Sequence, residues 1–119
     1  MKQTDRMARA SAIAEAAHDK KGQQLVALDV REVTSIADTF ILMTGTSDRH
    51  ARALADAVVE AVNRTGEKPL GVEGYDEGRW VLIDLGDVIV HVFQNEVREA
   101  YDLERLWSDA PAMELGAAA

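Results

Sequence analysis

The alternation of apolar and polar positions along the chain predicts two long helices in its first half. Small apolar residues at helical spacing predict a first helix, which Thr4 can cap and which the Lys20-Lys21-Gly22 sequence ends. A second helix follows a turn at residues 45–47, and its apolar positions recur every three or four residues. This stripe consists of Ala51, Leu54, Ala55, Val58 and Val62.

Shorter apolar runs predict strands around and after the second helix. The run at residues 39–44 is almost continuously apolar, which is typical of a strand covered on both faces. In residues 79–85 the pattern alternates and places Trp80 and Asp84 on the same face, and Gly86-Asp87 suits a two-residue hairpin turn. The predicted strands span residues 25–30, 39–44, 70–72, 79–85 and 88–93.

This order of elements predicts the fold class. A helix, two strands, a helix and then further strands indicate one α/β domain with a mixed sheet of about five strands flanked by helices. Asn95 can cap a short helix that carries Tyr101. We expect the domain to span residues 1–108 and residues 109–119, which are rich in alanine, to form a disordered tail.

Composition excludes several classes of protein. The 119 residues include no cysteine, so disulfides and thiolate metal sites are excluded. No apolar run approaches the roughly 20 residues of a membrane span, so we expect a soluble cytoplasmic protein. Residues 73–109 hold ten acidic and three basic side chains, a net charge of −7 within a total of −8. Such a segment repels nucleic acid and attracts basic partners, although solubility alone also explains an acidic surface.

Two polar groupings are candidates for chemistry, and each has a structural alternative. The turn at residues 45–50 precedes a helix, whose free amides can hold phosphate, but capping by Ser47 or Asp48 explains the same residues. Asp84 and Asp87 flank the hairpin turn and could share a cation or simply stabilise the turn. His91 lies in an apolar strand, which favours a buried structural histidine.

Aromatic residues in the acidic half are candidates for protein recognition. Trp80 follows the unusual sequence Glu73-Gly74-Tyr75, and tryptophan and tyrosine are enriched at binding hot spots. The same side chains can instead belong to the core, and Tyr101 has the same ambiguity.

The motifs in combination resemble the ribosomal silencing factor family, also called Iojap-related proteins. The resemblance covers residues 5–108. Its matching stretches are Leu28-Asp29-Val30, Asp38-Thr39-Phe40, Thr44-Gly45-Thr46-Ser47 with Arg49-His50, Pro69-Leu70-Gly71-Val72-Glu73-Gly74, Trp80, Asp84-Leu85-Gly86-Asp87-Val88-Ile89-Val90-His91-Val92 and Tyr101-Asp102-Leu103-Glu104-Arg105-Leu106-Trp107.

This resemblance implies a function. It implies a nucleotidyltransferase-like fold and binding to large-subunit ribosomal protein L-fourteen, which blocks association with the small subunit and represses translation in stationary phase or starvation. It also implies a homodimer when the protein is free. From the composition and charge we expect no membrane partner and no sequence-specific nucleic-acid partner. Organellar relatives act in large-subunit assembly, which gives an alternative role. We place partner binding on Glu73, Tyr75, Trp80, Asp84, Tyr101 and Glu104.

The relation to nucleotidyltransferases raises an enzymatic alternative. Those enzymes use a Gly-Ser pair followed by two carboxylates in Asp-x-Asp spacing to hold metal and triphosphate. No Asp-x-Asp follows Gly45 here, so such an enzyme would have to combine the turn at Gly45–Arg49 with Asp84 and Asp87. We therefore expect a protein that is not an enzyme and uses no cofactor or metal.

Overall fold

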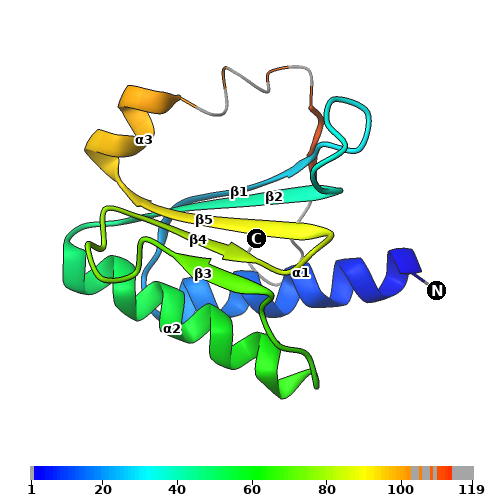
Figure 1. The fold of residues 1–119 in the computed structure, drawn as a ribbon, viewed down its shortest axis with the longest axis horizontal. Helices are drawn as coiled ribbons and strands as arrows, with labels where there is room; N and C mark the ends of the chain where they lie inside the picture. Colours follow the sequence, from blue (N-terminus) through cyan, green and yellow to red (C-terminus); the bar gives the residue numbers. More distant parts are fainter. Residues whose placement is uncertain (1, 103–104, 106–107, 109, 114–119) are drawn as a thin grey trace.

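The computed structural model confirms an α/β fold built on one mixed sheet (Figure 1). It describes residues 2–102, 105, 108 and 110–113. The strand order is β3-β4-β5-β2-β1-β6, in which β2 and β5 are parallel and all other neighbours are antiparallel. The elements are α1 (Lys2–Asp19), β1 (Gln23–Asp29), β2 (Thr39–Gly45), α2 (Asp48–Arg64), β3 (Gly71–Glu73), β4 (Trp80–Asp84), β5 (Val88–Gln94), α3 (Asn95–Tyr101) and β6 (Ala112–Met113).

One face of the sheet packs against α1 and α2 (Figure 1). The predicted stripe of α2 is buried as expected, and every residue of β2 is buried. The buried residues of α1 are mostly alanines, whose small side chains bring its backbone close to α2. The aliphatic core on this side includes Ile13, Ile41, Met43, Leu54, Val58, Val81, Ile83, Val90 and Val92.

The opposite face of the sheet carries α3 and a second core cluster (Figure 1). Because side chains alternate along a strand, Trp80, Leu82 and Asp84 of β4 point to this side, as predicted. The cluster contains rings as well as aliphatic side chains, and Trp80 and Leu82 are partly buried at its border. Its buried members are Leu28, Val30, Ala37, Phe40, Leu42, Ile89, Phe93, Val97 and Ala110.

The end of α1 differs from its prediction in detail. The left-handed residue is Lys21, with φ of 61°, and Gly22 donates its amide to the Ala17 carbonyl at 2.8 Å. Gly22 instead allows close packing, because an added Cβ would lie 3.1 Å from Leu54 Cδ2. The prediction of Thr4 as the first cap is also wrong, since α1 already includes Lys2.

The hairpin between β4 and β5 has the predicted two-residue turn. Leu85 donates its amide to the Val88 carbonyl at 2.9 Å, and Gly86 has φ of 90°, as the first central position of a type II′ turn requires.

Helix α3 begins differently from its prediction. Gln94 is the extended residue before it and Asn95 is its first residue, with its side-chain amide bound to Glu99.

The C-terminal residues depart in part from the predicted disordered tail. Ala112 and Met113 pair with Leu28 and Ala27 of β1, and Asp29 donates its amide to the Pro111 carbonyl at 2.9 Å. They therefore add a sixth strand to the sheet of about five that was predicted. Residues 109 and 114–119 of the predicted tail lie outside the described residues.

No helix among the described residues is long and apolar enough to cross a membrane.

Candidate protein-docking surface

An aromatic cluster occupies the α3 side of β4 and β5. The Trp80 indole lies 4.9 Å from the Tyr101 ring, 5.6 Å from the Phe93 ring and 6.0 Å from the His91 ring, measured between centroids. The His91 ring meets Phe40 edge-on at 5.0 Å. The strands β2, β4 and β5 together with α3 thus build one continuous group of rings, which extends from the core to the surface.

His91 holds the buried end of this cluster. Trp80 Nε1–H donates a hydrogen bond to His91 Nδ1 at 3.1 Å, and His91 is 5% exposed. Burial lowers the pKa of His91 to about 4, so the imidazole is neutral at neutral pH. Because Nδ1 accepts, the ring proton lies on Nε2, which is buried and has no hydrogen-bond partner within the described part of the chain.

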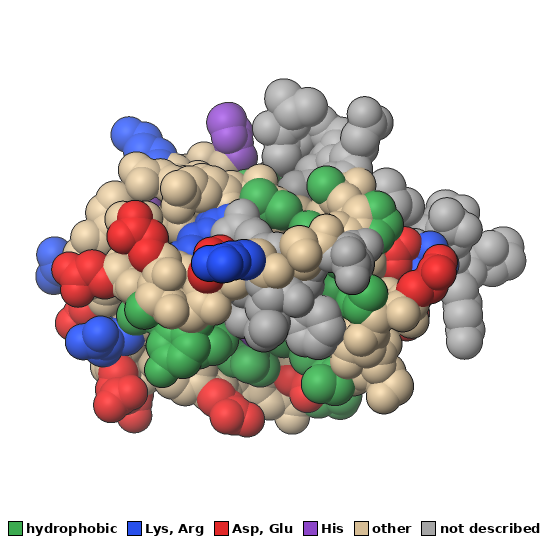
Figure 2. All heavy atoms as spheres, turned by 90° about the horizontal axis from the view of Figure 1, so that it is seen from above, with side chains coloured by type: hydrophobic (Ala, Val, Ile, Leu, Met, Phe, Trp, Pro, Cys, Tyr) green, Lys and Arg blue, Asp and Glu red, His purple; other side chains and the backbone are tan. Residues whose placement is uncertain are grey.

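Tyr101 forms the exposed end of the cluster. It is 61% exposed, its ring is tilted 53° from the Trp80 indole, and Trp80 and Leu82 are half-buried beside it. Glu73 faces Leu82 across the β3–β4 ladder, so its carboxylate lies on the same face at the edge of the sheet. Figure 2, which looks onto this side, shows hydrophobic side chains grouped along one margin with acidic side chains beside them.

The structure places four of the six predicted binding residues on one face of the sheet, with Trp80 and Asp84 at opposite ends of β4. Glu73, Trp80, Asp84 and Tyr101 belong to the α3 face, and we call this set the aromatic face. Tyr75 is separated from them, because its ring packs against the core on the α2 side and its hydroxyl donates to Asp56 at 3.1 Å. That hydrogen bond and the burial of the ring raise the pKa of Tyr75.

Glu104, the sixth predicted binding residue, lies outside the described residues.

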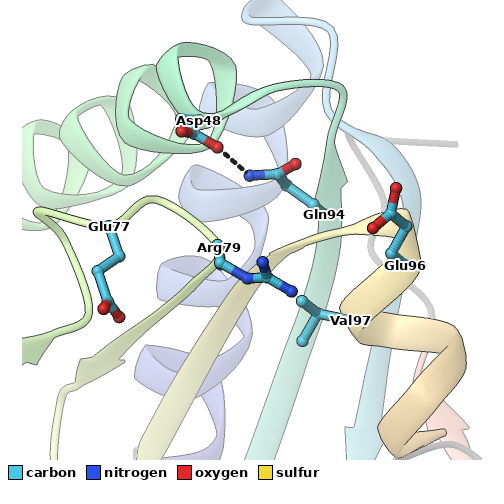
Figure 3. A pocket seen from close by; sticks show the side chains of 6 residues that line it. All are labelled: Asp48, Glu77, Arg79, Gln94, Glu96 and Val97. Carbon is cyan, nitrogen blue, oxygen red and sulfur yellow. Dashed lines mark hydrogen bonds between the residues drawn. The ribbon is translucent and has the colours of Figure 1, made fainter.

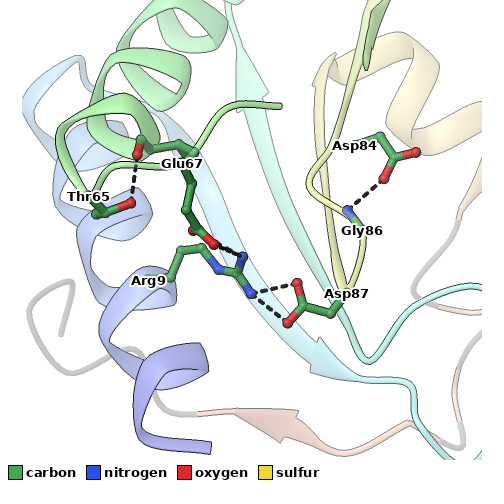
Figure 4. A network of polar contacts seen from close by, with 7 residues as sticks. Arg9, Thr65, Glu67, Asp84, Gly86 and Asp87 are labelled. Carbon is green, nitrogen blue, oxygen red and sulfur yellow. Dashed lines mark hydrogen bonds and ion pairs between the residues drawn. The ribbon is translucent and has the colours of Figure 1, made fainter. Parts of the chain in front are cut away.

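The two aspartates of the hairpin have structural roles. Asp84 accepts a hydrogen bond from the Gly86 amide at 2.8 Å, which stabilises the turn. Asp87 forms two hydrogen bonds with Arg9 of α1, and Arg9 also contacts Glu67 (Figure 4). The turn-stabilising interpretation is therefore confirmed for Asp84, whereas the Asp87 carboxylate connects the turn to α1.

Arg98 is a buried residue of this region that the sequence did not single out. Its guanidinium donates to the Gln24 carbonyl at 2.7 Å and to Thr44 Oγ1 at 2.9 Å, and it lies 5.6 Å from the Phe93 ring centre. These contacts fix α3 against β1 and β2, and so position Tyr101. The sequence carries only a weak signal for this role, namely that Arg98 directly follows the apolar Val97. The structure buries both residues.

The turn at residues 45–50 is built for capping. Ser47 Oγ accepts from the His50 amide at 3.1 Å, and the Thr46 amide donates to His50 Nδ1 at 2.9 Å. Two amides of the turn are therefore engaged within the protein. An added Cβ on Gly45 would lie 2.9 Å from the Ala51 nitrogen, so this glycine serves close packing. Capping by Ser47 is confirmed.

A polar hollow of about 150 Å³ lies beside this turn, where the parallel strands β2 and β5 end (Figure 3). Gln94 crosses it and donates to Asp48 at 2.5 Å and to the Gly78 carbonyl at 2.9 Å. The Asp48 carboxylate stands where an anion would have to bind. The residues that line the hollow are Asp48, Glu77, Arg79, Gln94, Glu96 and Val97.

The structure does not assemble the residues of the enzymatic alternative. Gly45 pairs with Gln94 at the end of β5, whereas Asp87 directly precedes the start of that strand. The length of β5, about 20 Å at its usual rise per residue, therefore separates the turn from the two aspartates. Within the described residues, no three histidine, aspartate or glutamate side chains are grouped so that they could hold a metal ion.

The fold and the aromatic face define a small single-domain α/β protein with an exposed aromatic surface at one margin of its sheet. Residues 3–119 match the family model described as ribosomal silencing factor during starvation. The chain therefore belongs to the ribosomal silencing factor family, as its motifs predicted.

Individual relatives agree with this assignment. A ribosomal silencing factor from Halalkalibacterium halodurans is 45% identical over 100 residues, which cover 84% of this chain and 86% of the relative. The mouse mitochondrial assembly of ribosomal large subunit protein 1 is 32% identical, over 60% of this chain and 32% of its own length. A crystal structure of a protein from Chromobacterium violaceum is 41% identical, with a TM-score of 0.81 and 86% of both chains covered.

Proposed function

We propose that the protein docks on the large ribosomal subunit through ribosomal protein L-fourteen and thereby blocks association with the small subunit. Translation is then repressed in stationary phase or starvation. Membership of the ribosomal silencing factor family and the names of the relatives support this function. The proposed mechanism is steric occlusion by a rigid domain in the cytoplasm, in which no bond is made or broken and no cofactor or metal takes part.

The aromatic pair of half-buried Trp80 and exposed Tyr101 is the observation that supports the aromatic face as the contact surface. Large amphipathic rings at a surface are typical anchors of protein interfaces. Glu73 at the margin of the face adds a carboxylate that suits a basic partner, and ribosomal proteins are usually basic. The acidic second half of the chain would at the same time keep the protein away from bare ribosomal RNA.

Cosedimentation with ribosomal particles tests the function. Purified protein should pellet with isolated large subunits and bind isolated L-fourteen protein, and it should not pellet with small subunits. Large subunits loaded with the protein should form fewer intact ribosomes when small subunits are added. Binding to small subunits instead of large ones would refute the proposal.

Substitution of Trp80 tests the contact surface. If Trp80 is a binding hot spot, Trp80→Ala should weaken binding to L-fourteen protein by about 2 kcal/mol or more. If it serves mainly the core, the loss should appear as a lower melting temperature instead. Asp84→Asn is the control with the smaller expected effect, because Asp84 already accepts the Gly86 amide. A Trp80→Ala protein that melts normally and binds fully would remove Trp80 from the surface.

The ionic-strength dependence of association tests whether the acidic half steers docking. Association should slow between low and physiological salt, where the screening length falls to about 8 Å, and dissociation should change less. Stopped-flow mixing with L-fourteen protein measures both rates. A salt-independent association rate would mean that the acidic segment serves solubility.

A role in large-subunit assembly is the second candidate function. The observation that favours it is the printed name of the mouse relative, mitochondrial assembly of ribosomal large subunit protein 1. The two roles differ in the particle that accepts the protein, since a silencing factor must bind mature large subunits.

We also propose that the free protein is a homodimer, which analytical ultracentrifugation tests directly.

A further inference from the structure

His91 is a polar residue in a place that otherwise holds apolar side chains. It lies in β5 between Val90 and Val92, and all three are buried. Its Nε2–H finds no hydrogen-bond partner within the described part of the chain. Burying an unpaired donor is unfavourable, and an apolar side chain at this position would avoid it. The imidazole must therefore supply something that an apolar residue cannot.

What the imidazole supplies is an acceptor for Trp80. The indole rests against the Phe93 and Tyr101 rings, which leave its N–H without a strong acceptor, and His91 Nδ1 takes this N–H at 3.1 Å. A hydrogen bond at one edge of the indole selects one orientation of the ring on the sheet. In that orientation the indole packs at 4.9 Å from the exposed Tyr101 ring.

We propose that His91 is a positioning residue for docking, which fixes the Trp80 indole so that Trp80 and Tyr101 present one preformed aromatic surface to the ribosomal partner. This inference rests on the proposed function, because the surface it prepares is the proposed contact surface. A preformed surface loses less side-chain freedom on binding, and so binds more tightly than a mobile one with the same atoms. The neutral state of His91, which its low pKa ensures, keeps Nδ1 available as an acceptor.

Two substitutions separate the acceptor from the volume of the side chain. His91→Leu removes the acceptor and leaves an apolar side chain of similar bulk, whereas His91→Asn keeps an oxygen near the position of Nδ1. In His91→Leu, the Trp80 indole N–H should exchange faster with solvent in NMR spectra and the Kd for L-fourteen protein should rise about tenfold. His91→Asn should restore both properties to within about threefold of the original protein. If His91→Leu fails to fold, His91→Phe can take its place, because phenylalanine also lacks a hydrogen-bond acceptor.

A double-mutant cycle shows whether His91 acts through Trp80. Trp80→Phe keeps an aromatic ring but has no N–H, so adding His91→Leu to it should leave the Kd unchanged. Full binding by His91→Leu, or an equal loss with and without the indole, would overturn the inference.

Trp80→Ala separates this failure from that of the proposed surface. Weak binding by Trp80→Ala with full binding by His91→Leu refutes the positioning role alone, whereas full binding by both refutes the surface as well. A protein with no affinity for L-fourteen protein refutes the proposed partner together with the inference.

Discussion

The two faces of the sheet are built from the same strands but from different chemistry. The face under α1 and α2 is aliphatic, and its residues in β2, β4 and β5 are fully buried. The α3 side carries rings, a buried histidine and a buried arginine, and its margin is partly exposed at Trp80 and Tyr101 of the aromatic face. Burying aliphatic side chains stabilises a sheet without the desolvation cost that buried polar groups carry. The polar groups of the second face therefore suit the docking role that we propose for this side.

The largest expected contrast comes from the same substitution on each face. Leu54→Ala, on the face of α2 that is fully buried, should lower the free energy of unfolding by about 3 kcal/mol, because it leaves a cavity. Leu82→Ala, at the half-buried margin of the aromatic face, should cost about 1 kcal/mol. Urea unfolding followed by circular dichroism measures both. Equal losses would contradict the difference in burial between the two faces.

The aromatic face should also make stability depend on pH. His91 has a pKa of about 4 in the folded protein and about 6.5 when unfolded, so the unfolded chain binds more protons between these values. The stability that depends on neutral His91 is therefore fully present above pH 6.5. It is lost as the pH drops toward 4, and this loss is on the order of 3 kcal/mol in total. Urea unfolding at pH 7 and pH 4.5 measures the loss.

His91→Leu is the control for this dependence. It removes the titrating group, so the part of the loss that belongs to His91 should disappear, and the loss that carboxylates contribute should remain. An unchanged pH profile in the variant would show that His91 is not protonated on unfolding in this range.

The difference between the faces also explains how much of the structure could be predicted from the sequence. Period-two and helical patterns predicted the helices, the mixed sheet and the shared face of Trp80 and Asp84, because local alternation determines which way side chains point. Pairings between distant residues are not local. The hydrogen bond from Trp80 to His91, the position of Arg98 under α3 and the separation of Tyr75 from Trp80 depend on strand register and loop paths.

A smaller effect is expected where α1 meets the hairpin. Arg9→Met removes the contacts of Arg9 with Asp87 and Glu67, which connect the helical layer to the turn of β4 and β5. Both carboxylates are about half exposed and can be hydrated in the variant, so the loss should be about 1 kcal/mol. Thermal melts in low salt measure it, and 1 M sodium chloride should reduce the difference. Binding to L-fourteen protein should not change, since Arg9 belongs to α1, which packs on the opposite side of the sheet from Trp80 and Tyr101.

The smallest effect on stability should come from Tyr75→Phe. The Tyr75 ring packs beside α2 and only its hydroxyl contacts Asp56 at the surface, so phenylalanine keeps the packing and the urea midpoint should hardly move. Its affinity for L-fourteen protein should equal that of the original protein. Tyr101→Ala is the comparison on the opposite side, where the exposed ring packs against Trp80, and there affinity should fall while the urea midpoint changes little. If Tyr75→Phe weakened binding and Tyr101→Ala did not, the contact surface would lie on the α2 side, and the exposed rings of the other face would need a different explanation.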